Sequence, residues 1–237
     1  AVAGKTYTAK WTKNGKTVRT TPLDFYNDAS NEWKTGCTQN GTLWTNAAEG
    51  WSWDTASQTL TLNGVTIDAQ LDENTSAAIR VLGDAKIITA DGTENFVYSR
   101  SEDENSKAIF VEGDLTISGK GKLTVVGKEI GIFAEKGNIA INAPVTATST
   151  GTSKGCSAIM AFGGDKKVEI KIDPSLSIVQ PADGRAMADD GVAWIAAGDK
   201  KEPVSNVVIG VAAPTFTDGL GNTIENAATY EKGTTTN

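Results

Sequence analysis

The sequence predicts an all-β protein, a right-handed single-stranded parallel β-helix (a solenoid) with an N-terminal cap. The first observation behind this prediction is a phrase that recurs. It consists of a small residue, an apolar residue, a variable residue, a second apolar residue and, shortly afterwards, a Gly-Asp or Gly-Asn pair. Copies of the phrase occupy residues 78–84, 108–114, 131–138, 158–165 and 193–199. Internal repetition of this kind indicates a stacked repeat architecture.

Two further observations favour strands joined by tight turns. The chain contains 25 glycines but only 6 prolines, a composition that suits short strands with frequent corners. Many short segments alternate between apolar and polar residues, so each should show one face to a core and one face to water. These segments include residues 86–89, 115–117, 123–125, 139–141, 145–147 and 168–172.

The repeats are expected to stack as coils of three strands each. We take Ile79, Ile109, Ile132, Ile159 and Trp194 as equivalent positions, and the intervals between them are unequal. Unequal spacing argues against helical repeats and fits a β-solenoid, in which the strands are kept and the loops vary in length. About six coils are expected, with parallel strands about 4.8 Å apart along the axis.

The ends of the chain differ from the repeats. Residues 1–50 contain three tryptophans and little clean alternation, and we interpret them as an N-terminal cap that covers the first edge strands. Residues 51–210 are expected to form the coils, beginning with two alternating strands around the turn at 55–58. Residues 211–237 are expected to form a C-terminal cap and tail.

Composition excludes several classes of function. The net charge is −7 and there is no basic stripe, which excludes nucleic acid as a partner because phosphate contacts supply most of that affinity. No apolar run approaches the roughly 20 residues of a membrane-spanning helix, so membrane insertion is not expected. Histidine is absent, which removes the commonest general base and the commonest metal ligand.

The two cysteines allow two interpretations. Cys37 and Cys156 lie far apart in the sequence and match no zinc-binding pattern. They could form one disulfide in an exported protein, or they could be two small apolar residues with free thiols.

The stretch from Trp51 to Gly64, followed by coils of Ala-Ile-x-Val-x-Gly-Asp, resembles a family of bacterial cell-surface right-handed β-helix domains. These domains are described as carbohydrate-binding or adhesin-like and are related in shape to pectate lyases. The resemblance covers roughly residues 51–200. It implies a secreted or cell-surface location and binding of a polysaccharide or a host or cell-wall glycan, with calcium bound in some relatives. It carries no sugar-contacting residue over to this sequence.

The aspartates of the Gly-Asp corners are expected to stack in a column. The column would contain Asp84, Asp114, Asp165 and Asp199, with Asn138 in the intervening position. Like charges about 5 Å apart repel, and a calcium ion could relieve the repulsion. Nearby lysines could also relieve it, and aspartate at a turn often has a purely structural role because its side chain accepts hydrogen bonds from backbone amides.

Aromatic and sulfur-containing side chains supply a second set of candidate ligand-binding residues. Phe110, Phe133 and Met160 occupy the variable position of the repeated strand and are expected to form an outward-facing column. Such a column would serve as a stacking platform for sugar rings, or another part of the chain would cover it. Trp51 and Trp53 share one side of a strand, where they would contact sugar or form the core of the cap.

Function is expected to be non-catalytic. The leading hypothesis is an extracellular polysaccharide-binding or adhesin-like module, and the alternative is a structural spacer for surface display. The third hypothesis is a pectate-lyase-like carbohydrate-active enzyme, a polysaccharide lyase or hydrolase. It ranks last because a hydrolase needs two carboxylates across one linkage, and Asp189-Asp190 is the only adjacent aspartate pair. We nominate no catalytic residue and expect no cofactor other than calcium.

Overall fold

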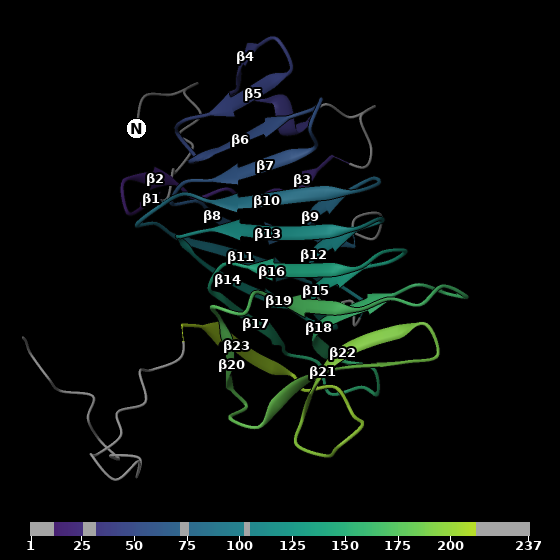
Figure 1. Cartoon of the computed structure of the whole chain (residues 1–237). Helices are drawn as coiled ribbons and strands as arrows, with labels where there is room; N and C mark the ends of the chain where they lie inside the picture. Colours follow the sequence, from purple (N-terminus) through teal and green to yellow (C-terminus); the bar gives the residue numbers. More distant parts are fainter. Residues whose placement is uncertain (1–11, 26–31, 72–75, 102–104, 212–237) are drawn as a thin grey trace, which may run out of the picture.

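Parallel strands stack along one long axis in this protein (Figure 1). The computed structural model describes residues 12–25, 32–71, 76–101 and 105–211. Within these residues, three long sheets form the walls of a parallel β-solenoid, and a 3₁₀ turn is the only helical element. The predicted fold class is therefore confirmed.

The three walls can be followed in Figure 1 by their strand labels. Sheet 1 consists of β4 (Thr38–Asn40), β5 (Leu43–Asn46), β6 (Trp51–Asp54), β7 (Thr59–Leu62), β10 (Ala85–Thr89), β13 (Leu115–Gly119), β16 (Ile139–Asn142) and β19 (Ile170–Ile172). Sheet 2 consists of β8 (Thr66–Gln70), β11 (Glu94–Arg100), β14 (Lys122–Gly127), β17 (Val145–Ser149), β23 (Asn206–Gly210) and β20 (Ser177–Gln180). Sheet 3 consists of β3 (Leu23–Asp24), β9 (Ala77–Val81), β12 (Lys107–Val111), β15 (Ile130–Ala134), β18 (Ser157–Phe162), β22 (Val192–Ala197) and β21 (Gly184–Asp189). The remaining elements are β1 (Thr12–Lys13), β2 (Lys16–Thr17) and the 3₁₀ turn η1 (Glu32–Lys34).

Each coil takes one strand from each sheet, as the alternating segments predicted. Within the described residues the complete coils are β7–β8–β9, β10–β11–β12, β13–β14–β15 and β16–β17–β18, and β19 begins the next. The solenoid thus has about four turns, fewer than the six expected. The difference arises because the strands after β19 run antiparallel to their neighbours and do not form a further coil.

The repeated isoleucines form a buried column. Ile79, Ile109, Ile132 and Ile159 are direct neighbours across sheet 3, and each has 0% of its surface exposed. Trp194 was expected in the same column, and that expectation is wrong. β22 pairs antiparallel with β18, and Trp194 lies opposite Met160.

A tight hairpin explains this reversal of direction. β21 and β22 are joined at Asp190 and Gly191, which have φ angles of 43° and 75°. Two successive positive φ angles are typical of the two-residue turn that links antiparallel strands. The repeated phrase in residues 193–199 therefore looks like a coil strand in sequence but belongs to a hairpin.

The inner faces of the three sheets form one continuous apolar core. Alternate residues of the coil strands are buried, as in β13, where Leu115 and Ile117 are 1% and 0% exposed. Burying such a side chain contributes about 1.5–3 kcal/mol. The period-two pattern in the sequence therefore identifies which residues hold the coils together.

Antiparallel strands close the N-terminal end. β4, β5 and β6 extend sheet 1 as a meander that pairs with β7. β6 therefore belongs to the cap, and the parallel coils begin at β7 rather than at residue 51. This arrangement leaves no parallel strand of sheet 1 unpaired at the top of the stack.

Antiparallel strands also close the C-terminal end. β23 pairs with β17, β22 pairs with β18, and β20 and β21 pair with them in turn. The parallel coils therefore end at β19 and do not reach residue 210 as expected. The expected tail falls almost wholly in residues 212–237, which lie outside the described residues.

Both cysteines are free thiols. Cys37 lies in the N-terminal cap, and its Sγ donates to the carbonyl oxygen of Trp33 at 3.4 Å. Burial raises the pKa of the Cys37 thiol. Cys156 directly precedes β18, near the other end of the solenoid.

Candidate functional site

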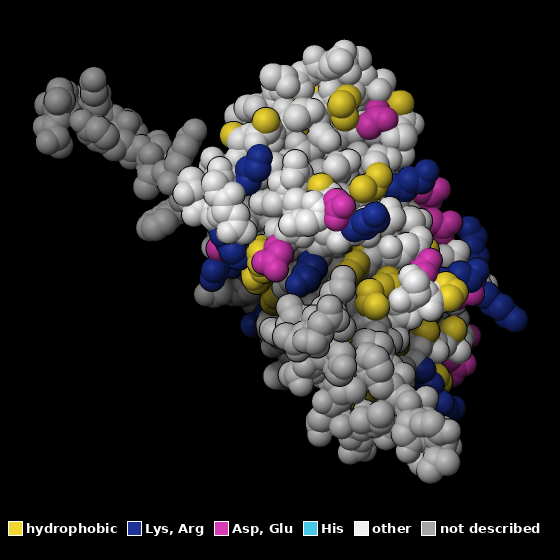
Figure 2. Space-filling model, turned by 60° about the vertical axis from the view of Figure 1, so that its left-hand side comes forward, with side chains coloured by type: hydrophobic (Ala, Val, Ile, Leu, Met, Phe, Trp, Pro, Cys, Tyr) yellow, Lys and Arg dark blue, Asp and Glu magenta, His cyan; other side chains and the backbone are white. Residues whose placement is uncertain are grey.

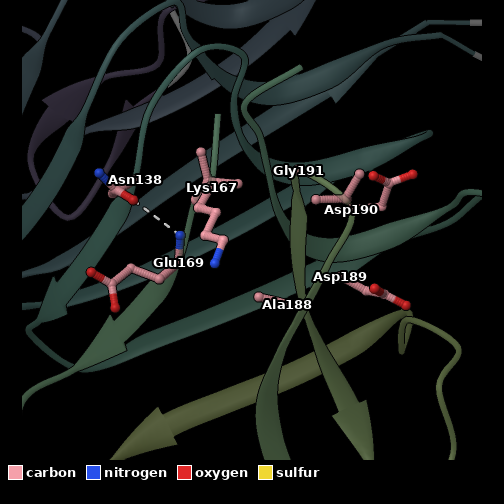
Figure 3. Close-up of a pocket in the computed structure, with 9 residues that line it drawn as sticks. Asn138, Lys167, Glu169, Ala188, Asp189, Asp190 and Gly191 are labelled. Carbon is pink, nitrogen blue, oxygen red and sulfur yellow. Dashed lines mark hydrogen bonds between the residues drawn. The ribbon is translucent and has the colours of Figure 1, made fainter. Parts of the chain in front are cut away.

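A ladder of hydrogen bonds runs along the corner at which the chain passes from sheet 3 to sheet 1. Asp84 Oδ1 accepts a hydrogen bond from the backbone N–H of Asp114 at 2.8 Å. Asp114 Oδ1 accepts from the backbone N–H of Asn138 at 2.6 Å. Asn138 Oδ1 accepts from the backbone N–H of Glu169 at 3.0 Å, the bond drawn in Figure 3. We call Asp84, Asp114 and Asn138 the Asx ladder, because each side chain bonds the backbone of the following coil.

The ladder explains why glycine precedes the acidic residue in the repeated phrase. A Cβ atom on Gly113 would lie 2.2 Å from Asp84 Oδ1, and one on Gly137 would lie 2.6 Å from Asp114 Oδ1. Real Cβ atoms do not approach this closely, so the side chain of one coil needs a glycine in the next. The Gly-Asp pair therefore allows neighbouring coils to stack, and it also allows the chain to turn at the corner.

Asp165 and Asp199 are not part of the ladder, and this corrects the expected column. Ile139 pairs with Ile170, so Glu169 takes the place after Asn138. Asp165 lies in the longer connection of residues 163–169, upstream of that place. Asp199 follows the antiparallel strand β22, and its carboxylate lies 3.3 Å from Arg185.

The ladder contains two carboxylates, those of Asp84 and Asp114. Among the described residues, no group of three Asp, Glu, Cys or His side chains is close enough to hold a metal ion. Asp84 and Asp114 each use one carboxylate oxygen for a backbone amide. Lys136 Nζ lies 2.6 Å from Glu112 Oε1.

Three adjoining hollows follow the ladder along the corner. The upper hollow, of about 390 Å³, is lined by Ser57, Gln58, Lys86 and Thr116 together with ladder residues. The middle hollow has a volume of about 330 Å³ and the lower hollow about 540 Å³. We call the three together the corner groove.

Shared side chains show that the hollows are continuous. Asp84 and Asp114 line both the upper and the middle hollow. Asn138, Lys167 and Val168 line both the middle and the lower hollow. The corner groove therefore extends from the β6–β7 turn to the β21–β22 hairpin.

The lower hollow lies between the start of β19 and the β21–β22 hairpin. Figure 3 shows Lys167 and Glu169 on one side and Ala188 facing them from the hairpin. The carboxylates of Asp189 and Asp190 point away from Lys167 in this view. Although both aspartates line the hollow, they do not face each other across it as the carboxylates of a glycosidase would.

The predicted aromatic column is present but largely covered. Phe110, Phe133 and Met160 are direct neighbours across the outer side of sheet 3. Phe110 is only 8% exposed, while Phe133 and Met160 are half-buried. The two rings are 5.9 Å apart and tilted by 51°, so they do not form the flat exposed platform that sugar stacking requires.

Trp51 and Trp53 belong to the core of the N-terminal cap. They are 2% and 5% exposed, and Phe25 stacks on Trp53 with ring centroids 4.3 Å apart. Trp51 Nε1 donates to Glu49 at 2.7 Å. Neither indole ring has a face open to a sugar, so of the two interpretations of this pair the structure favours the core of the cap.

The outer face of sheet 2 mixes charged side chains of both signs with apolar ones, including the stacked rings of Phe96 and Tyr98. Asp68 and Arg100 form an ion pair on neighbouring strands, and Glu94 and Lys122 form a weaker one at 3.8 Å. Figure 2 shows hydrophobic side chains scattered among acidic and basic ones on this side of the molecule. No helix of the described residues is long and apolar enough to cross a membrane.

A family model for carbohydrate-binding domain-containing proteins matches residues 34–198, more than two thirds of the chain. The chain belongs to this family. The match spans the cap meander, the coils and the β21–β22 hairpin, and therefore includes the whole corner groove. No curated protein and no solved structure matches the chain.

Sequence reasoning did not find the corner groove as a site. It noticed the ladder residues, the lysines and the Asp189-Asp190 pair, but as separate features. Lys167 and Ala188 lie far apart in the sequence. They line the same hollow only because β21 and β22 form an antiparallel hairpin. The available signal was the Gly-rich connection at residues 163–164 opposite the Asp-Gly turn at residues 190–191.

Proposed function

We propose that this protein binds a polysaccharide chain in the corner groove, outside the cell, without catalysing a reaction on it. The observation that carries the proposal is the continuity of the three hollows along one corner of a carbohydrate-binding domain. Ladder positions recur about every 4.8 Å along the axis. A groove that follows several coils has room for several sugar units in an extended chain.

The chemistry of the lining residues suits sugar hydroxyl groups. Lys86 and Lys167 are exposed donors, Ser57 and Thr116 carry hydroxyls, and Gln58 offers an amide. Hydroxyl groups both donate and accept hydrogen bonds, so a lining of mixed donors and acceptors complements them. The Asx ladder holds the floor of the groove in place before ligand arrives, which reduces the entropy lost on binding.

The same geometry supports binding without catalysis. Asp84 and Asp114 are occupied by backbone amides, and Asp189 and Asp190 point away from Lys167. A lyase or hydrolase instead needs acid and base groups directed at one linkage. An adhesin-like role at the cell surface is part of the proposal, and antibody labelling of intact cells of the source organism tests it.

Affinity electrophoresis in native gels containing β-glucan, xylan or polygalacturonate tests the binding function. We expect at least one of these polymers to retard the protein. Lys86→Ala and Lys167→Ala should each weaken binding about tenfold, because a charged hydrogen bond contributes about 1.5–3 kcal/mol. Lys122→Ala, which makes the same change on sheet 2, should leave binding unchanged.

Two outcomes would refute the proposal. The first is retardation of the double variant Lys86→Ala/Lys167→Ala equal to that of the wild type. The second is the absence of retardation by any polymer in the panel, the result expected of a structural spacer. Release of unsaturated uronides from polygalacturonate would show instead that the protein is a lyase.

A further inference from the structure

The lower end of the corner groove is closed by a longer connection. The first three connections from sheet 3 to sheet 1 are short, spanning residues 82–84, 112–114 and 135–138. The fourth spans residues 163–169 and extends outward from the stack (Figure 1). Short connections leave the corner recessed, whereas the long one stands across its lower end.

The β21–β22 hairpin reinforces this closure. The backbone N–H of Gly163 donates to the carbonyl oxygen of Gly191 at 2.7 Å. A Cβ atom on Gly191 would lie 2.0 Å from the carbonyl oxygen of Gly164. The connection and the hairpin tip are thus in backbone contact, and only glycine permits it. We call residues 163–169 and 188–192 together the end wall.

The lower hollow lies between the two segments of the end wall, which supply every lining residue except Asn138, and it is the largest of the three. Its volume of about 540 Å³ falls in the range of small-molecule sites, about 300–1,000 Å³. Lys167 and Glu169 supply a donor and an acceptor on one side, and Ala188 leaves space on the other (Figure 3). A groove that bound only the internal sugars of a continuing chain would not need a hollow at its lower end.

We infer that the corner groove binds the end of a polysaccharide chain, with the terminal sugar in the lower hollow against the end wall. A terminal sugar carries a free hydroxyl where an internal sugar carries the next linkage. That hydroxyl can bond Lys167 or Glu169, while a continuing chain would meet the wall. This inference rests on the proposed function and adds which part of the polymer is bound.

The test compares chain lengths at equal mass. Short and long fractions of the same β-glucan, xylan and polygalacturonate are titrated with wild-type protein, and bound protein per gram is measured at saturation. Binding at chain ends predicts an amount inversely proportional to chain length. Borohydride reduction of the short fraction then distinguishes the two ends, because it abolishes binding only if the reducing end is recognised.

A matched pair of variants locates the bound end. Ala188→Trp fills the lower hollow and should abolish binding of the short fraction. Ala186→Trp places the same side chain on the same strand, outside the residues that line the hollow, and should bind as the wild type does. Circular dichroism of both variants verifies that β structure is retained.

The outcomes separate the two proposals. Equal bound protein per gram for short and long fractions would overturn end recognition while leaving polysaccharide binding intact. Wild-type affinity in Ala188→Trp would overturn the placement of the terminal sugar. If the wild type binds no polymer of the panel, the proposed function fails and end recognition fails with it.

Discussion

Replacing Asp114 by alanine measures how strongly the Asx ladder holds neighbouring coils together. The substitution removes Oδ1, which accepts from the backbone N–H of Asn138 at 2.6 Å and from its side-chain amide at 3.1 Å. Hydrogen bonds to a charged group contribute about 1.5–3 kcal/mol, and the exposure of Asp114 favours the lower part of this range. We expect the free energy of unfolding to fall by about 2 kcal/mol, or the thermal midpoint by about 4–8 °C.

The assay is urea unfolding followed by tryptophan fluorescence and by far-ultraviolet circular dichroism. Asp114→Asn should retain most of the wild-type stability, because Asn138 already performs the same role through its amide oxygen at 3.0 Å. Asp165→Ala is the matched control, since Asp165 follows a glycine in the same way but lies outside the ladder. The reasoning is refuted if Asp114→Ala unfolds like the wild type, or if Asp114→Asn destabilises as much as Asp114→Ala.

Four other substitutions test the core, an exposed ion pair and the end wall. Ile109→Ala should lower the free energy of unfolding by about 2–5 kcal/mol, and Ile88→Ala, at a position 36% exposed, by much less; equal losses in urea unfolding would contradict the assignment of faces. The hydrogen bond from Lys136 lowers the pKa of Glu112, so the wild type should be more stable than Glu112→Gln at neutral pH. This advantage should disappear as the pH falls below the ordinary glutamate value, and a pH-independent difference would show that the pair does not stabilise the fold. Gly191→Ala should detach the hairpin tip and raise amide hydrogen exchange in residues 184–197, whereas unchanged exchange would show that the close backbone contact is not required.

The fold was predictable because the recurring isoleucines and the period-two alternation both indicate stacked strands. Ile79, Ile109, Ile132 and Ile159 recur within strands of clear period two, and the structure places them side by side. Trp194 was misplaced because the repeated phrase specifies a strand and a turn but not the direction of the strand. The direction depends on the tight turn at residues 190–191, which lies before the phrase and outside it.

The candidate site was less predictable because it depends on contacts between coils. The sequence shows that aspartate follows glycine at a corner, but not that its side chain reaches the backbone of the next coil. The place that follows Asn138 along the ladder, which Glu169 occupies, could not be assigned from sequence. The extra residues of the 163–169 connection shift Asp165 out of register. Burial of Trp51 and Trp53 likewise depends on Phe25, from a segment distant in sequence.

The Asx ladder also makes the coils interchangeable units of construction. Deleting residues 109–131 would bring Ile132 into the place of Ile109 and set Asn138 beside Asp84, so that an existing acceptor meets an existing amide. The shortened protein would keep both caps and lose one step, about 4.8 Å, of its axis. Gaining or losing whole turns would therefore lengthen or shorten the stretch of glycan that a related protein binds.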